Sequence, residues 1–153
     1  MPIIDLTTII YATPENCFDL SLNIDLHMQS MEQTNEKAIG GITSGAIKLG
    51  ETVRWRARHF GIYFTMTIQI ADLIRPVRFT DEMIKGPFKY LRHQHFFEPI
   101  PEGTHMTDRF DFQSPLGILG SMADQVFLES YMRNLLIKRN EWIKAIAERK
   151  ENL

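Results

Sequence analysis

The chain has 153 residues, of which 44% are hydrophobic and 24% charged, and its formal net charge is −2. This length suits one domain with its own core, and the near-neutral charge argues against a protein that binds nucleic acid through phosphates. Cys17 is the single cysteine, which excludes an internal disulfide and a cysteine metal cluster. We expect a cytoplasmic protein, because the start of the chain lacks a signal-peptide pattern and no apolar stretch approaches the roughly 20 residues of a membrane span.

The first third of the chain predicts one strand, two short helices and a second strand. Residues 3–12 are rich in β-branched side chains, which favour a strand. Residues 13–15 (Thr-Pro-Glu) form a helix start, with a capping hydroxyl, a proline at the first helical position and an acid in the first turn. We expect this helix to break at residues 21–23 before a second one over Ile24–Met31. Four glycines punctuate residues 36–50, which predicts a strand followed by a loop.

From Glu51 onward the hydrophobic pattern changes to long alternating segments. Five such segments predict strands at residues 51–60, 62–74, 77–85, 88–98 and 104–113. Glycine and proline turns separate them, and such short connections imply antiparallel neighbours.

After a break at Ser114–Gly117 the hydrophobic period becomes helical. A long helix over Met122–Arg149 is predicted from a stripe formed by Leu128, Met132, Leu135, Trp142 and Ile146. A large sheet has a face to bury, and this is the single substantial helix that could cover it. The predicted fold is therefore an α+β helix-grip fold, a curved seven-stranded antiparallel sheet around the C-terminal helix with two short helices after the first strand. Because those helices close the wrap only in part, an internal cavity is expected.

Several segments resemble the START-like superfamily, also called SRPBCC or Bet v 1-like proteins, over the whole length of the chain. The opening strand leads into ATPENCFDL (12–20), which is similar to the usual entry of these proteins. Four further segments resemble a bacterial subfamily of ligand-binding domains: 50–61, 79–99, 106–112 and 131–142. The resemblance implies a single domain over 1–153 with a cavity for an apolar or amphipathic small molecule. It implies no reaction, since members include lipid carriers, hormone binders and polyketide cyclases.

Alternation along each strand assigns side chains to the two faces of the sheet. The apolar residues expected on the inner face are Trp55, Phe64, Met66, Ile68, Phe79, Met83, Leu91 and Phe110. The same alternation brings five polar residues to this face, namely His59, Asp81, His93, His95 and Asp108. For strand 88–98, Tyr90 and Phe96 favour the opposite face. The predicted ligand-binding set is completed by Met132, Leu135 and Arg139 of the long helix.

Hairpin geometry predicts two pairs among the polar residues. Asp81 is expected opposite His93, and His95 opposite Asp108. Directly opposed residues have Cβ atoms about 4.5–5.5 Å apart, which is within reach of an imidazole–carboxylate hydrogen bond. Such a partner would raise the pKa of His93 above its ordinary value, while burial acts in the opposite direction.

Three interpretations of these polar groups stay open. In the first, the polar groups satisfy one another's hydrogen-bonding needs. In the second, they anchor polar atoms of a ligand in an apolar pocket. Alternatively, a histidine–aspartate pair is a general acid–base of a cyclase or dehydratase, with His93, His95, Asp81 and Asp108 as candidate catalytic residues. Strand spacing alone does not establish the convergent ligands of a metal site, so neither metal nor cofactor is predicted.

The predicted function is storage, transport or sensing of a hydrophobic or amphipathic small molecule between the sheet and the long helix, by a monomer or weak homodimer. Methionine is adaptable and suits pockets for varied apolar ligands. An interaction protein without a ligand would instead show a packed interior and an exposed apolar patch.

Overall fold

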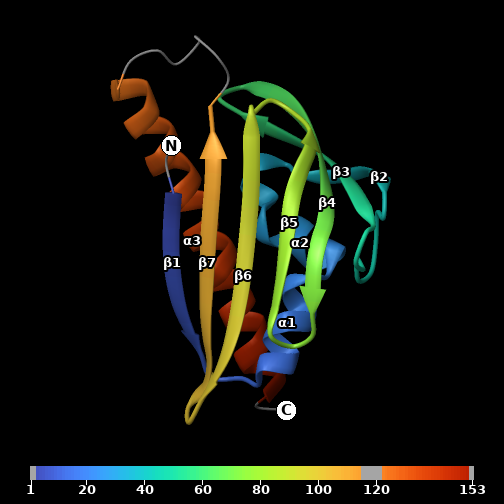
Figure 1. Cartoon of the computed structure of the whole chain (residues 1–153), viewed down its shortest axis with the longest axis vertical. Coiled ribbons are helices and arrows are strands. Elements are labelled where there is room, and N and C mark those ends of the chain that lie inside the picture. Colours follow the sequence, from blue (N-terminus) through green and yellow to red (C-terminus); the bar gives the residue numbers. More distant parts are fainter. Residues whose placement is uncertain (1–2, 115–121, 152–153) are drawn as a thin grey trace.

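The computed structural model describes residues 3–114 and 122–151 (Figure 1). Its elements, in chain order, are β1 Ile3–Ile10, α1 Pro14–Ser21, α2 Ile24–Ser30, the 3-10 turn η1 Glu32–Thr34, β2 Lys37–Gly41, β3 Thr52–His59, β4 Ile62–Ile74, β5 Arg78–Lys85, β6 Tyr90–Ile100, β7 Gly103–Gln113 and α3 Met122–Glu151. Of the break expected at Ser114–Gly117, residues 115–117 lie outside the described part.

The strands form one antiparallel sheet in the order β1-β7-β6-β5-β4-β3-β2. The sheet curves around α3, which runs along its concave side, and α1 and α2 lie at one end of the wrap (Figure 1). The predicted helix-grip architecture is confirmed. Among the described helices, none is long and apolar enough to cross a membrane.

Local capping explains where the two short helices begin. The Asn16 backbone N–H donates to the Thr13 hydroxyl at 3.3 Å, directly before the proline that starts α1. Asn23 caps α2 in the same way, because its side-chain oxygen accepts from the Leu26 N–H at 3.0 Å. Each cap satisfies a backbone donor that the first helical turn leaves without a partner.

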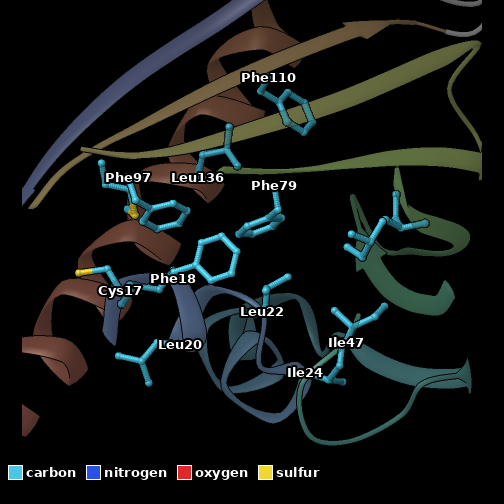
Figure 2. Packing of buried hydrophobic residues seen from close by; sticks show 14 of the residues in the cluster. Cys17, Phe18, Leu20, Leu22, Ile24, Ile47, Phe79, Phe97, Phe110 and Leu136 are labelled. Atoms are coloured by element: carbon cyan, nitrogen blue, oxygen red, sulfur yellow. The ribbon is translucent and has the colours of Figure 1, made fainter. Parts of the chain in front are cut away.

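Aromatic packing fills the end of the wrap beside α1. The Phe18 ring meets Phe79 and Phe97 edge-on, with centroids 5.5 and 5.3 Å apart. Cys17 is buried among the same side chains (Figure 2). Because side chains fill this end, the larger cavities under the sheet lie closer to the β3–β4 hairpin and the first half of α3.

Several element boundaries differ from the predictions by one or two residues, and two of these differences have a local cause. β1 ends at Ile10, because Ala12 already leads toward the cap of α1. β6 continues to Ile100 and pairs with Gly103, so a tight turn replaces the longer loop expected between these strands.

The buried face of α3 also differs from the predicted apolar stripe. Leu135 is buried as expected, whereas Trp142 and Ile146 are only partly buried. The remaining buried positions that the stripe omitted are Leu136, Arg139, Asn140, Ile143 and Ala147. Two polar residues therefore face the sheet at the centre of the helix: Arg139, which belongs to the predicted binding set, and Asn140, which the hydrophobic period did not reveal.

Gly103 is required where the β6–β7 turn passes the end of β1. Its φ is +148°, and an added Cβ would overlap the Ile10 carbonyl oxygen and lie 2.8 Å from the Ala12 nitrogen. Gly103→Ala is therefore expected to lower the free energy of unfolding by about 2 kcal/mol in urea titrations. Gly61→Ala is the control, because Gly61 has φ +78° with open space around it. This variant should lower the free energy of unfolding by only about 1 kcal/mol. Equal losses in the two variants would contradict the steric explanation.

Candidate functional site

Two adjoining cavities lie between the sheet and α3. The outer chamber has a volume of about 430 Å³ and the inner chamber about 140 Å³. They share the walls formed by Glu36, Trp55, His59, Met66 and Met132. The two chambers are therefore neighbours beneath the sheet, and they differ in chemistry.

The outer chamber is apolar. Its further walls include Phe64, Phe88, Leu128 and Tyr131, and the exposed Phe60 lies at its edge. One polar contact crosses it, between His59 Nδ1 and the Tyr131 hydroxyl at 2.7 Å. Burial lowers the pKa of His59 and raises the pKa of Tyr131, so both groups favour their neutral forms. This chamber suits hydrocarbon or aromatic groups.

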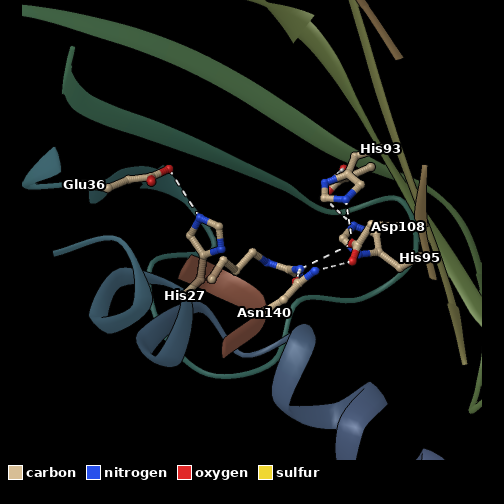
Figure 3. A network of polar contacts seen from close by, with 8 residues as sticks. His27, Glu36, His93, His95, Asp108 and Asn140 are labelled. Carbon is tan, nitrogen blue, oxygen red and sulfur yellow. Dashed lines mark hydrogen bonds and ion pairs between the residues drawn. The ribbon is translucent and has the colours of Figure 1, made fainter. Parts of the chain in front are cut away.

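The inner chamber contains a cluster of two histidines and an aspartate, with a second aspartate behind them. His93 and His95 alternate on β6, between Asp81 of β5 and Asp108 of β7 (Figure 3). His93 Nε2 is 2.8 Å and His95 Nδ1 is 3.2 Å from the same Asp108 oxygen, Oδ1. On the other side, His95 Nε2 is 3.5 Å from Asp81 Oδ2 and His93 Nδ1 is 4.0 Å from Asp81 Oδ1. Each imidazole thus lies between two carboxylates.

Asp108 connects this cluster to α3. It is fully buried and accepts a hydrogen bond from Asn140 Nδ2 at 2.7 Å. Arg139 Nη1 lies 3.5 Å from Asp108 Oδ1 and donates to Asn140 Oδ1 at 2.9 Å. Although burial acts to raise it, the hydrogen bond from His93 and the 3.2 Å contact with His95 hold the pKa of Asp108 well below its usual range. Asp108 is thus the ionised centre of a buried network.

The predicted registers are confirmed, because Asp81 pairs with His93 and His95 with Asp108 across the strands. The predicted rise in the pKa of His93 is wrong. Burial, followed by the charge of neighbouring His95, lowers the pKa of His93 to about 4 despite its hydrogen bond to Asp108. The pKa of Asp81 is also lowered, because the effect of burial, which acts to raise it, is outweighed by the 3.5 Å contact with His95 and by the charges of His95 and His93. Desolvation therefore decides the protonation state of His93.

Solved structures place this architecture among known folds. The ZhuI aromatase/cyclase from Streptomyces sp. R1128 superposes with a TM-score of 0.78 at 14% identity, over 97% of this chain and 94% of that one. The fold is the Bet v 1-like helix-grip fold. Ginseng major latex-like protein 151 from Panax ginseng gives a TM-score of 0.68 at 14% identity, covering 95% and 97% of the two chains. A protein from Thermus thermophilus gives a TM-score of 0.70 at 17% identity, covering 95% and 99%.

No family model and no curated protein sequence matches the chain significantly. The likeness to Bet v 1-like proteins therefore concerns the fold, and the resemblance to a bacterial ligand-binding subfamily stays a prediction.

Most predicted binding residues line one of the two chambers of this helix-grip fold. Those around the inner chamber are Trp55, His59, Met66, Ile68, Asp81, Leu91, His93, His95, Phe110, Met132, Leu135 and Arg139. Phe64 lines the outer chamber, and Phe79 lines a separate space of about 50 Å³ beside α2. Met83 and Asp108 are not among the residues that line these spaces. Met83 packs against the core, and Asp108 supports the histidines.

A second polar pair was missed by sequence reasoning. His27 of α2 lies 3.3 Å from Glu36, which directly precedes β2 (Figure 3). The His27 ring is also 4.5 Å from the Trp55 ring. Glu36 is buried, although a charged residue at the start of a predicted strand suggests exposure. Other chamber residues absent from the predicted binding set are Ser21, Met31, Ala57, Phe60, Pro87, Phe88, Leu128, Tyr131 and Leu136. Those from the helices and loops have no alternation pattern that could reveal them.

Proposed function

We propose that the protein binds an amphipathic small molecule, with its apolar part in the outer chamber and a polar group toward the inner one. The observation that carries this proposal is the junction of an apolar chamber of about 430 Å³ with a polar one of about 140 Å³. Small-molecule sites are commonly apolar cavities of roughly 300–1,000 Å³ with a few convergent polar groups. Arg139, Asp81 and the two histidines of β6 supply such groups here.

Ligand titration of a blocked variant tests this proposal. Palmitate, a short-chain quinone and a fused-ring phenol are titrated by thermal shift, and bound molecules are identified by native mass spectrometry. Met132 lies at the wall between the chambers, so Met132→Trp should weaken binding of the best probe at least about tenfold. Ile137→Trp is the matched control, because Ile137 is 37% exposed on the same helix and lines neither chamber.

Equal affinity in the two tryptophan variants would place the ligand outside the chambers. No stabilisation by any probe, and no co-purified molecule, would contradict the binding proposal.

Acid–base catalysis on the bound molecule is the second candidate function. The observation that favours it is that His93 lines the inner chamber while its Nε2 lies 2.8 Å from Asp108. A neutral imidazole held by a carboxylate is a general base for a ligand carbonyl or hydroxyl compound. In the same titrations, loss of one water from the recovered ligand, abolished in His93→Gln, would support a dehydratase. Unchanged ligand throughout would argue for binding alone.

A further inference from the structure

The polar floor of the inner chamber has the composition of a metal site. We propose that Asp81, His93 and His95 bind a divalent transition-metal ion such as Zn²⁺. Each residue offers one donor atom, and these three atoms all lie within 4.8 Å of one another. The proposal revises the expectation of a metal-free protein, and it does not depend on the proposed small-molecule ligand.

The spacing of the donors is close to that around a bound ion. Ligand atoms about 2.1 Å from a tetrahedral ion are about 3.4 Å apart. His95 Nε2 is 3.5 Å from one Asp81 oxygen, and His93 Nδ1 is 4.0 Å from the other. Because the three donor atoms lie within 4.8 Å of one another, side-chain shifts of about 1 Å would bring them to this spacing. Two imidazoles and one carboxylate suit zinc and its first-row neighbours.

The second nitrogen of each ring is oriented as in a metal-bound histidine. His93 Nε2 and His95 Nδ1 both face Asp108, at 2.8 and 3.2 Å. Metal-ligating histidines characteristically donate this second N–H to a carboxylate, which fixes the tautomer and the ring orientation. Asn140 in turn holds Asp108 with a 2.7 Å hydrogen bond. Asp108 therefore supports His93 by a direct hydrogen bond and lies 3.2 Å from the second nitrogen of His95.

This orientation leaves a buried mismatch that a cation would resolve. With its Nε2–H donating to Asp108, His93 has the lone pair of Nδ1 facing the carboxylate of Asp81, and His95 Nε2 faces the same carboxylate when His95 is protonated at Nδ1. His95 is 1% exposed, and neither of its two ring nitrogens makes a hydrogen bond. Acceptors facing one another in a buried site repel unless a cation lies between them. A divalent ion at this point would be shared by all three acceptors.

Charge and access agree with the same site. The two aspartates carry two negative charges, and buried Arg139 balances one of them, so the cluster attracts a cation. The three donors also line the inner chamber. The fourth coordination position would therefore open into the chamber, where water or an anionic oxygen of a bound molecule could occupy it.

Metal titration of the full chain tests the proposal. Protein stripped with a chelator is titrated with Zn²⁺ by calorimetry, and with Co²⁺ by visible absorption, without added organic ligand. We expect one ion per chain and the intense d–d bands of low-coordinate cobalt. Asp81→Asn and His95→Gln should each lower Zn²⁺ affinity by at least about 100-fold, since loss of a supporting residue alone typically lowers it 10–100-fold.

Glu82→Gln is the matched control, because Glu82 is the next residue of β5 and pairs with Arg92 at 3.3 Å. It should retain the parent affinity. Absence of saturable binding by the parent, or equal affinities of Asp81→Asn and Glu82→Gln, would overturn the proposal.

NMR of the histidine rings in the parent protein tests the metal site without any substitution, so the result does not depend on whether a variant folds. Zn²⁺ should shift the ring signals of His93 and His95 and leave those of the half-exposed His105 in place. Shifts confined to His105 would place the ion on the surface and overturn the proposal. Since no organic ligand is present, failure of this site would leave the Met132→Trp result unaffected.

Discussion

Asp108→Asn is expected to lower the free energy of unfolding by about 3–5 kcal/mol, because it removes one charge from a buried pair. Asp108 is 0% exposed, and the neighbouring Arg139 is also buried. Without the carboxylate, the guanidinium would keep only the Asn140 oxygen at 2.9 Å as a partner among the contacts described here. The hydrogen bonds from His93 and Asn140 would be weakened in the same variant. Urea denaturation at pH 7.5, followed by circular dichroism, measures the loss.

A surface ion pair provides the control for this prediction. Asp72 Oδ2 lies 2.8 Å from Arg78 Nε, which is as short as the buried contacts, but both side chains are at least 40% exposed. Asp72→Asn should therefore lower the free energy of unfolding by less than about 1 kcal/mol.

A double-mutant cycle with Arg139→Met separates the ion pair from general damage at Asp108. If the guanidinium left without its carboxylate causes the loss, Asp108→Asn should destabilise the Arg139→Met background less than the parent. A loss below about 1 kcal/mol in the parent background would show that the buried charge of Asp108 does not stabilise the fold.

Acidification of the metal-free protein from pH 7 to pH 4 is expected to remove about 3 kcal/mol of stability through His93 alone. The pKa of His93 is lowered from 6.5 to about 4 in the folded protein. The unfolded chain therefore binds a proton near pH 6.5, whereas the folded chain resists it until about pH 4. Stability is complete above the unfolded pKa and declines as the pH falls through this window. His59, whose pKa burial also lowers, acts in the same direction.

Urea titrations at intervals between pH 7.5 and 4, with chelator present, measure this decline. In His93→Gln the decline should be about 3 kcal/mol smaller. Gln94→Ala, at the neighbouring position of β6, removes no titratable group and should keep the parental slope. Stability that rises between pH 7 and 5 would contradict the lowered pKa and favour a histidine whose charge is stabilised by its aspartates.

Residues that follow a strand period could be placed from the sequence. A one-residue slip would turn every inner side chain outward, so the apolar set on each strand determines its face and register. This reasoning placed His93 opposite Asp81 and His95 opposite Asp108, as the structure has them. The same local logic found α1 and α2, because their capping residues act within one helical turn.

Only the tertiary structure decided what these side chains do. The paired register suggested two separate histidine–aspartate pairs, yet both rings contact both carboxylates. The connection of Asp108 to Asn140 joins residues 32 positions apart, and it depends on how deeply α3 sits in the sheet. Alternation along a strand determines which face of the sheet each side chain occupies. Packing determines its rotamer, its depth of burial and its partners from other elements. The protonation of His93 depends on its burial. The sequence therefore determined on which face of the sheet the cluster lies, and the tertiary structure determined the charge of the cluster.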